Sequence, residues 1–527
     1  MRDGAHAPTQ TPMTNPEAGE RNSVGVGVLA LVCFKLMLHV AAAVETPYEF
    51  HRDEFLYIAM GNHLQFLRMD FPPMIALLSE AVRRVAESSL FAYRLIPALA
   101  GTSVVWLAVL AVRAMGGGQR AQALTAIAVI FNPLFLRTSS LFQPVVLDQL
   151  WWMLGFYALV NIVNTEDRRW WILLGVACGL GLLSKFSILF FGAATLVGLL
   201  LTRPRAFLTP WPWCAFGVAL LLGAPTVVGQ VHLGFPLLDQ MASLTHGQLD
   251  RVTFASFVGE QALWGPFALL FAGMGLVALL RDGFLARYSV LGWTALTAFV
   301  LFALTKGKSY YVGPIYPVLF AAAAAWIERM DHGARRAALS WGFPAMAILY
   351  GITTAPFGLP ILPPELMARY AARSGVIAGV RTNRGELLTL PQDYADMLGW
   401  REKAEAVKAA LEKLSREEQS GAVLYGANYG QAGSLEFYGR ELRLPPVVSL
   451  AGSFYLFGPG NRPGRTLIIL GVERSEVSGI ACRVLEEVAR VANRWGVPEE
   501  RDVPILVCRD PNQTLQEYWR RQRPHWG

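Results

Sequence analysis

The sequence predicts a polytopic α-helical membrane protein with about eleven transmembrane helices, followed by a C-terminal soluble α/β domain. Only 16% of the 527 residues are charged, whereas a soluble protein usually has about 25%. The mean hydropathy is +0.37, and the apolar residues form runs near the roughly 18–20 residues that span about 30 Å of hydrocarbon. In lipid every backbone polar group must be paired within the segment, so these runs are expected to be helices.

The N-terminal segment and the first apolar run differ sharply in composition. Residues 1–23 are polar and contain Pro, Thr and Gly, which predicts a disordered cytoplasmic N-terminus. Residues 24–44 form the first apolar run, which is long for the core of a signal peptide and has only a weakly basic flank. An uncleaved membrane anchor is therefore favoured over a cleaved signal peptide.

Ten further apolar runs complete a predicted transmembrane domain over residues 24–356. Lys185 separates two of them, which could instead be one long run broken by a charge. The largest loop, residues 45–90, follows the first span. The ten runs are residues 90–112, 121–138, 146–163, 170–184, 186–202, 209–229, 255–280, 287–304, 313–328 and 337–356.

Arginines in short loops predict the orientation in the membrane, because cytoplasmic loops carry an excess of positive charge. If the spans alternate, five arginine-containing loops fall on one side, which we assign to the cytoplasm. The loop 45–90 and the tail 357–527 then face the periplasm. The net charge of +7 suits loops at an anionic leaflet, and its scatter argues against a nucleic-acid partner. The loops contain Arg120, Arg168, Arg169, Arg203, Arg205, Arg281, Arg287, Arg329, Arg335 and Arg336.

The tail, residues 357–527, has the pattern of a small α/β domain. EKAEAVKAALEKL, which begins at Glu402, has the apolar period of a helix. AVLYGANY, RTLIILGV and VPILVC predict buried strands, and CRVLEEVARVANRW predicts a further helix. Cys482 and Cys508 could form a disulfide if the tail is periplasmic. The other three cysteines lie in apolar runs and are expected to be buried: Cys33, Cys178 and Cys214.

Three acids are candidate catalytic residues. Asp53 and Glu54 are adjacent in HRDEFLY, just after the first span. A carboxylate at the edge of a membrane cavity can act as a general base for an acceptor hydroxyl, although both could also be solvated loop acids. Asp148 lies inside an apolar run, where an acid costs about 3 kcal/mol unless it faces a polar cavity. It could instead lie at the interface, at the end of a shorter span.

Cations and phenols near the outer ends of spans could bind a lipid-linked phosphate. Lys306, Lys308, Tyr310 and Tyr311 lie together in KGKSYYVGPIYP. The alternative is a belt of interfacial lysine and tyrosine. Lys185 lies between two apolar stretches and could alternatively extend to the lipid headgroups. In the first loop, Pro72-Pro73 begins an amphipathic segment expected to lie on the membrane surface.

In order and spacing, these segments resemble the dolichyl-phosphate-mannose:protein mannosyltransferase-like family of GT-C glycosyltransferases. That family includes the bacterial aminoarabinose transferases that modify lipid A. The resemblance covers most of the chain. It rests on HRDEFLY, DFPP, AYRLIPALAG, QPVVLD, LSK at Lys185, KGKSYYVGPIYP, LPQDYADMLGW and GANYGQAGSLEFYG.

The resemblance implies a GT-C helical bundle with a cavity open to the periplasm, a polyprenyl-phosphate sugar donor and inversion at the anomeric carbon. Asp53 would be the base with Glu54 beside it, and Asp148 would shape the acceptor site. One departure stands out: some relatives have a lysine before the loop proline, where this chain has Asp70-Phe71-Pro72-Pro73. Candidates for the donor phosphate are Lys185, Lys306, Lys308, Tyr310, Tyr311 and Arg94, with Arg251 as a further alternative.

The predicted function is transfer of a hexosyl or pentosyl group to a hydroxyl or phosphate of a lipid, glycan or protein acceptor. The sequence has no Asp-x-Asp, CxxC or HxxH motif, so no metal is expected to be obligatory, although a divalent metal could take part. The main alternative is a transporter or flippase of a lipid-linked sugar, but the internal repeats typical of transporters are not evident. A third reading is a structural subunit of an envelope complex whose tail binds partners.

Overall fold

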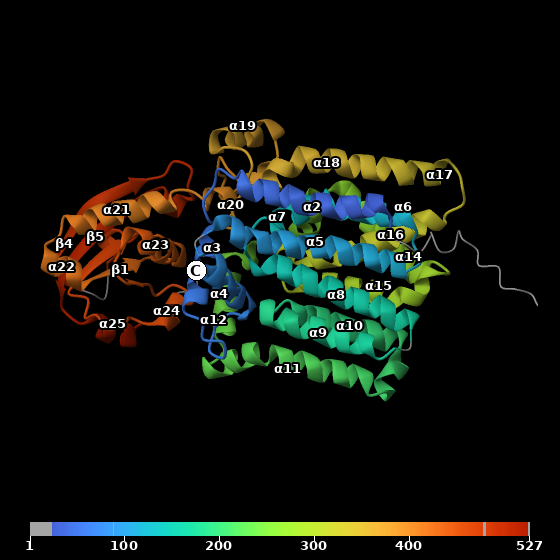
Figure 1. The fold of residues 1–527 in the computed structure, drawn as a ribbon, viewed down its shortest axis with the longest axis horizontal. Helices are drawn as coiled ribbons and strands as arrows, with labels where there is room; N and C mark the ends of the chain where they lie inside the picture. Colours follow the sequence, from blue (N-terminus) through green and yellow to red (C-terminus); the bar gives the residue numbers. More distant parts are fainter. Residues whose placement is uncertain (1–23, 88, 166, 478–480, 525–527) are drawn as a thin grey trace, which may run out of the picture.

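The computed structural model describes residues 24–87, 89–165, 167–477 and 481–524. The predicted disordered segment, residues 1–23, lies outside them. Long apolar helices form a bundle, and a smaller part that contains a β-sheet is attached to one end of it (Figure 1). The predicted architecture, a multi-pass helical membrane protein with a small C-terminal sheet domain, is confirmed.

All eleven predicted apolar segments have helical counterparts. Seven helical stretches in the described chain are long and apolar enough to cross a membrane, or eight if the pair Phe254–Trp264 and Pro266–Arg281, bent by 104°, is one span. The principal helices are α2 (Val26–Val44), α5 (Leu90–Ala114), α6 (Gln119–Ile130), α7 (Pro133–Thr138), α8 (Pro144–Asn164), α9 (Arg169–Ser184), α10 (Ile188–Thr202), α11 (Trp211–His232), α12 (Pro236–Gly247), α13 (Phe254–Gln261), α14 (Pro266–Arg281), α15 (Ser289–Leu304), α16 (Tyr316–Arg329) and α18 (Phe343–Gly358).

Two of the predicted spans are broken for local reasons. Asn132 caps α7 by accepting a hydrogen bond from the Leu134 amide at 3.0 Å, so the run 121–138 divides into α6 and α7. Gly265 has a φ of +123°, a conformation that favours glycine. Pro266 then starts α14, and the run 255–280 bends at this point.

The arginine-containing loops gather at one end of the bundle. Asn164 donates a hydrogen bond to the Ala114 carbonyl at 2.7 Å and accepts one from the Tyr288 hydroxyl at 2.6 Å. Arg168 lies 5.4 Å from the Trp211 ring, and Arg329 lies 3.5 Å from the Phe284 ring. These contacts join the ends of α5, α8, α11, α15 and α16. The first loop and the C-terminal part lie at the opposite end (Figure 1).

The first loop contains two helices, α3 (Arg52–Asn62) and α4 (Met74–Ala86). The His51 ring and the Glu54 side chain cap the start of α3 reciprocally. The helix predicted after Pro72-Pro73 is confirmed as α4, in which Glu80 pairs with Arg83 at 2.6 Å and with Arg84 at 2.7 Å.

The C-terminal part forms a five-stranded mixed sheet with helices around it. Strands β1 (Ala422–Gly426), β2 (Val447–Val448), β3 (Thr466–Leu470), β4 (Cys482–Ala492) and β5 (Asp502–Pro511) lie in the order β2-β1-β3-β5-β4. β1 is parallel to β2 and β3, while β5 is antiparallel to β3 and β4. The helices include α19 (Pro364–Ser374), α20 (Gln392–Ala395), α21 (Trp400–Glu412), α22 (Arg416–Gly421), α23 (Tyr429–Leu442), α24 (Phe454–Phe457) and α25 (Leu515–Arg521).

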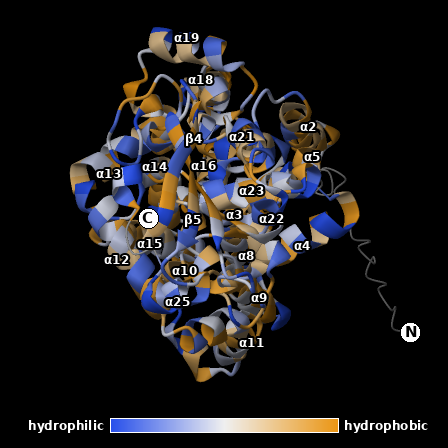
Figure 2. Ribbon diagram, turned by 90° about the vertical axis from the view of Figure 1, so that its left-hand side faces the viewer, coloured by the Kyte–Doolittle hydropathy of each residue, from blue (hydrophilic) through white to orange (hydrophobic). Residues whose placement is uncertain are grey.

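The helix and the three strands predicted in the tail are present, but the second predicted helix is wrong. CRVLEEVARVA forms β4, an edge strand paired with β5, and a Cys482–Cys508 disulfide joins the two strands. Most β4 side chains are exposed or half-exposed, so its polar residues mimic a solvated helix face. Seen from the end where the C-terminal part lies, hydrophilic and hydrophobic residues are mixed along the visible helices and strands (Figure 2).

The expectation that the three remaining cysteines are buried is also wrong. Cys33 and Cys214 are exposed and Cys178 is half-buried. The outer surface of a membrane bundle faces lipid hydrocarbon and not water. An apolar side chain is therefore as stable on that surface as in the interior of the bundle.

Candidate active site

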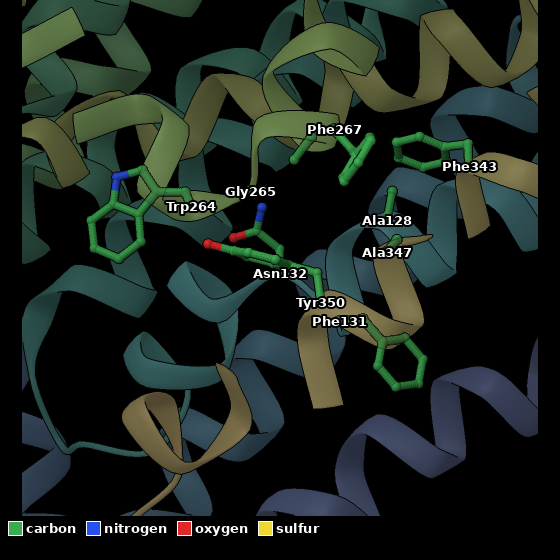
Figure 3. Close-up of a pocket in the computed structure, with 10 residues that line it drawn as sticks. Ala128, Phe131, Asn132, Trp264, Gly265, Phe267, Phe343, Ala347 and Tyr350 are labelled. Atoms are coloured by element: carbon green, nitrogen blue, oxygen red, sulfur yellow. The ribbon is translucent and has the colours of Figure 1, made fainter. Parts of the chain in front are cut away.

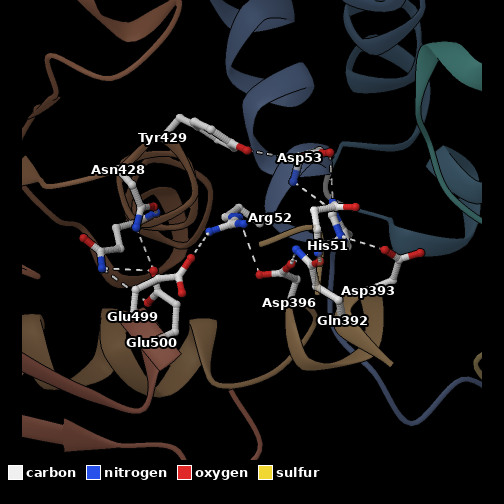
Figure 4. A network of polar contacts seen from close by, with 12 residues as sticks. His51, Arg52, Asp53, Gln392, Asp393, Asp396, Asn428, Tyr429, Glu499 and Glu500 are labelled. Carbon is white, nitrogen blue, oxygen red and sulfur yellow. Dashed lines mark hydrogen bonds and ion pairs between the residues drawn. The ribbon is translucent and has the colours of Figure 1, made fainter. Parts of the chain in front are cut away.

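Asp53 lies in the first turn of α3, at the junction of the bundle and the C-terminal part (Figure 4). One carboxylate oxygen accepts a hydrogen bond from the Tyr429 hydroxyl at 2.9 Å, and the other accepts one from Gln143 Nε2 at 3.1 Å. The Asp53 amide donates to Nδ1 of His51 at 3.0 Å. The side chain remains 31% exposed, so this carboxylate is both held in place and accessible.

Glu54 is oriented the other way and is fully buried. Its carboxylate accepts hydrogen bonds from the His51 amide at 2.7 Å and the Phe142 amide at 2.8 Å, and it pairs with Arg94 at 3.1 Å. Arg94 also donates to the Glu49 carbonyl at 2.8 Å. Glu54 and Arg94 therefore form a buried ion pair that connects α3 to α5.

Lys308 precedes the short helix η5 (Ser309–Ile315) and is near enough to Asp53 to interact with it electrostatically. Its burial, together with the nearby cations Lys185 and Arg137, lowers its pKa to about 8, although Asp53 and Asp393 act in the opposite direction. Within the described residues, the Lys308 ammonium has no hydrogen-bond or ion-pair partner. An anion that entered the site would find this cation without a competing carboxylate bound to it.

Lys185 and Asp148 interact with each other and with the aromatic rings that follow Lys308. The Lys185 ammonium is 4.6 Å from the centre of the Tyr311 ring and 5.5 Å from that of Tyr310. Asp148, 2% exposed in the second turn of α8, accepts a hydrogen bond from Trp152 at 3.1 Å and interacts electrostatically with Lys185. The structure thus groups six of the predicted site residues: Asp53, Asp148, Lys185, Lys308, Tyr310 and Tyr311.

Lys306 is not part of this group. Its ammonium is half exposed and forms an ion pair with Asp250 at 3.2 Å. Arg251, the neighbour of Asp250, is exposed as well. The two lysines of KGKSYY therefore have different surroundings, although only one residue separates them.

Sequence reasoning missed several residues that complete the site. Arg137, at the end of α7, forms a bidentate ion pair with Asp393, with Nη2 and Oδ1 2.6 Å apart. Burial acts to raise the pKa of Asp393, but Arg137 outweighs it and the pKa is lowered. Nε2 of His51 is 3.9 Å from both Asp393 and Asp396. An arginine at the end of an apolar run and the acids of LPQDYADM were the available signals.

Asp70 lies in the first loop, two residues before Pro72. It is buried and accepts hydrogen bonds from the Ser453 hydroxyl at 2.9 and 3.0 Å, and burial raises its pKa to about 6. A pocket of about 160 Å³ lies beside it, lined by His63, Gln65, Arg68, Met69, Asp70, Leu233, Leu456 and Phe457. Asp70 therefore connects the first loop to the C-terminal part.

A second, smaller pocket lies within the bundle (Figure 3). It has a volume of about 20 Å³, and its lining is mainly apolar. Its one phenol, Tyr350, donates a hydrogen bond to the Leu263 carbonyl at 2.8 Å. The lining residues contain no acid or cation, so this pocket offers no acid–base chemistry: Ala128, Phe131, Asn132, Trp264, Gly265, Phe267, Ala268, Phe343, Ala347 and Tyr350.

No group of three or more His, Cys, Asp or Glu side chains is arranged to hold a metal ion in the part of the chain that the structure describes. The positive charges found at this site belong to lysine and arginine side chains.

The fold is that of a GT-C glycosyltransferase. It is similar to ArnT from Cupriavidus metallidurans bound to undecaprenyl phosphate, with a TM-score of 0.61, 16% identity, and coverage of 91% of this chain and 98% of that one. ArnT in the apo state gives a TM-score of 0.59 at 17% identity, with coverage of 93% of this chain and 98% of that one. The arabinofuranosyltransferase AftD from Mycobacteria gives a TM-score of 0.52 at 14% identity over 93% of this chain and 40% of that one.

Residues 70–228 match the family model of the dolichyl-phosphate-mannose-protein mannosyltransferases. This match and the fold confirm the resemblance that the sequence motifs indicate. No curated protein sequence matches the chain.

Proposed function

We propose that the protein is an inverting glycosyltransferase that moves a hexosyl or pentosyl group from a polyprenyl-phosphate carrier to an acceptor hydroxyl or phosphate. One observation carries the proposal. An accessible carboxylate, Asp53, and an unpaired cation, Lys308, lie close enough to interact electrostatically at one end of a membrane bundle. This pairing supplies the two groups that glycosyl transfer from a phosphate needs.

The reaction follows from the chemistry of these groups. Asp53 takes the proton of an acceptor hydroxyl while the acceptor oxygen forms a bond to the anomeric carbon. The bond from that carbon to the phosphate oxygen breaks, and its electron pair stays on the polyprenyl phosphate. Lys308 and Lys185 stabilise the charge that develops there. Attack from the face opposite the phosphate inverts the anomeric carbon.

The depth of the cations suits a lipid-linked phosphate. The polyprenyl chain must stay in the bilayer, so its phosphate lies near the headgroups. Lys308 lies at the end of a span that begins at Ser309, and Lys185 joins α9 to α10. The Tyr310 and Tyr311 rings lie beside Lys185, and their hydroxyls can donate to phosphate oxygens. Because ArnT was solved with undecaprenyl phosphate, we infer that this lipid is the first carrier to test.

The remaining acids have supporting parts in this proposal. Asp148 interacts electrostatically with Lys185 and helps to shape the acceptor site. Glu54 holds the start of α3, and so the Asp53 backbone, through its bonds to Arg94 and to the Phe142 amide. Neither needs to exchange a proton with substrate.

We further infer that the site faces the periplasm, with the N-terminus cytoplasmic and the protein in the inner membrane. The arginine-containing loops lie at the end of the bundle away from α3, the helix that contains Asp53 (Figure 1). The positive-inside rule assigns that end to the cytoplasm. The Cys482–Cys508 disulfide in the C-terminal part agrees with an oxidising compartment. Residues 24–356 would then form the transmembrane catalytic domain, and residues 357–527 the periplasmic domain.

The test is turnover by the purified protein in liposomes. The substrates are undecaprenyl-phosphate sugars, each radiolabelled in the sugar, with envelope lipid or glycan extract as acceptor. We expect the label to leave the carrier, and Asp53→Asn to slow transfer by about 10²–10⁴-fold while undecaprenyl phosphate still binds. Asp331→Asn, at an exposed site on a loop at the other end of the bundle, is the matched control. Label that crosses the bilayer still attached to its carrier would refute transfer and favour the transporter.

A further inference from the structure

Tyr429, the first residue of α23, reaches the candidate base from the C-terminal part of the chain (Figure 4). Its hydroxyl donates to Oδ1 of Asp53 at 2.9 Å across 376 positions of sequence. The motif around it, GANYGQAGSLEFYG, is part of the family resemblance, yet the proposed reaction gives it no role. A residue of the C-terminal part that donates a hydrogen bond to the proposed catalytic carboxylate is expected to affect its function.

Two glycines allow α23 to approach α3 this closely. A Cβ at Gly430 would lie 2.4 Å from Cγ of Arg52, and a Cβ at Gly433 would lie 2.8 Å from Cβ of Phe55. Neither distance is compatible with a side chain at these positions. The glycines of the motif therefore set the separation at which the Tyr429 hydroxyl can meet Asp53.

The Tyr429 side chain is itself held in position. Asn428 caps α23 by accepting a hydrogen bond from the Gln431 amide at 2.9 Å, and its amide group donates to Glu500 at 2.7 Å. The Arg52 guanidinium lies 5.8 Å from the centre of the Tyr429 ring. These contacts come from both parts of the molecule, so the position of the hydroxyl depends on how they are docked.

Asp53 is then anchored at both oxygens by donors from separate elements. Gln143, which precedes α8, donates a hydrogen bond to Oδ2, and Tyr429 donates one to Oδ1. An ionised carboxylate has about four acceptor positions, so two remain for the acceptor hydroxyl. With either anchor missing, the carboxylate could rotate about its side-chain bonds.

We propose that Tyr429 is a positioning residue for the Asp53 base, so that docking of the C-terminal part completes the active site. This inference rests on the proposed function. The alternative explanation is that Tyr429 only stabilises the interface between the bundle and the C-terminal part.

Tyr438 separates the two explanations. It lies on the same helix, α23, and its hydroxyl donates to the Glu49 carboxylate of the first loop at 2.9 Å. Both tyrosines thus contribute one hydroxyl to a first-loop carboxylate across the same interface. Tyr438→Phe removes a docking bond of the same kind that does not involve Asp53.

The experiment compares the full-length Tyr429→Phe and Tyr438→Phe proteins in liposomes, with the radiolabelled undecaprenyl-phosphate sugar that the wild-type protein turns over. A misplaced base of this kind costs up to about 10²-fold. We expect Tyr429→Phe to lower kcat by about 10- to 100-fold, with the KM for the donor and the affinity for undecaprenyl phosphate unchanged. Tyr438→Phe should stay within about twofold of wild type. Both variants should melt within a few degrees of it, since each loses one hydrogen bond.

A double-mutant cycle provides a second readout. In an Asp53→Asn background, Tyr429→Phe should cause no further loss, because the group that it positions is already inactive. Wild-type kcat in Tyr429→Phe, or equal losses in the two tyrosine variants, would overturn the positioning role alone. A wild-type protein that binds undecaprenyl phosphate but transfers no sugar would overturn the proposed function, and the positioning role with it.

Discussion

Lys308→Met is the sharpest test of the phosphate site, because the chain supplies its own control two residues away. Lys308 is partly buried, lies near Asp53 and Lys185, and has no ion-pair partner among the described residues. Lys306 is half exposed and already paired with Asp250. Methionine keeps the apolar stem of lysine and removes the charge, so each variant isolates one ammonium group.

The magnitude follows from the type of contact. A charge-assisted hydrogen bond contributes about 1.5–3 kcal/mol, or about 10- to 150-fold in undecaprenyl phosphate affinity. The phosphate gains charge as the glycosidic bond breaks, so kcat should fall as well. Lys306→Met should leave the affinity for undecaprenyl phosphate and kcat within about twofold of wild type. It removes only a surface ion pair, which contributes at most about 1 kcal/mol to stability.

The pH dependence has a definite sign. The pKa of Lys308 is lowered to about 8, mainly by burial, so its ammonium is charged below pH 8 and loses its proton above it. Undecaprenyl phosphate binding should therefore weaken as the pH rises through about 8. In Lys308→Arg this decline should disappear, because a guanidinium stays charged throughout.

Binding can be measured by titrating labelled undecaprenyl phosphate into the protein in nanodiscs between pH 6.5 and 9.5, and turnover with saturating donor. A Lys308→Met protein with wild-type affinity, wild-type kcat and the same decline with pH would refute the assignment. The phosphate would then have to be sought at Lys185 alone.

Three further predictions concern stability and topology. Glu54→Gln leaves the buried Arg94 without its partner, so we expect about 3–5 kcal/mol of destabilisation; normal melting with a selective loss of turnover would contradict this. Burial raises the pKa of Asp70 from 3.8 to about 6, so folding stability should fall as the pH rises through that interval, by about 2–3 kcal/mol in all. Asp70→Asn should accordingly melt above wild type at pH 7.5 and level with it at pH 4, and a lower melting temperature at pH 7.5 would count against the assignment. Cys482→Ser should cost about 3 kcal/mol, and in intact cells the Cys482 and Cys508 thiols should react with maleimide only after reduction; labelling without reductant would place the domain in the cytoplasm.

The helical part of the fold is predictable from the sequence because hydrocarbon imposes one requirement, an apolar run long enough to span it. The fold of the C-terminal part is less predictable from the sequence. β4 carries Glu486, Glu487 and Arg490 on an edge strand, and a solvated edge strand and a solvated helix face have similar composition. Its pairing with β5 is a long-range choice that local periodicity does not record.

The candidate site was likewise only partly predictable from the sequence. Asp53 and Lys308 could be proposed from their own segments, since an acid and a lysine next to membrane spans are informative by themselves. The environment of each side chain could not be predicted. Lys306 and Lys308 are almost adjacent in sequence, but one pairs with Asp250 and the other lies beside Asp53. Tyr429 comes from a distant segment, and only the docking of α23 against α3 brings it to the site.

Acids of the first loop hold the C-terminal part against the bundle. Three acids of this loop each accept a hydrogen bond from the C-terminal part: Glu49 from Tyr438, Asp53 from Tyr429, and Asp70 from Ser453. These acids of the first loop thus contact the C-terminal part, whereas the candidate cations for the phosphate, Lys185 and Lys308, belong to the bundle. If Tyr429 positions the base, the same docking that Asp70 supports also prepares Asp53 for proton transfer.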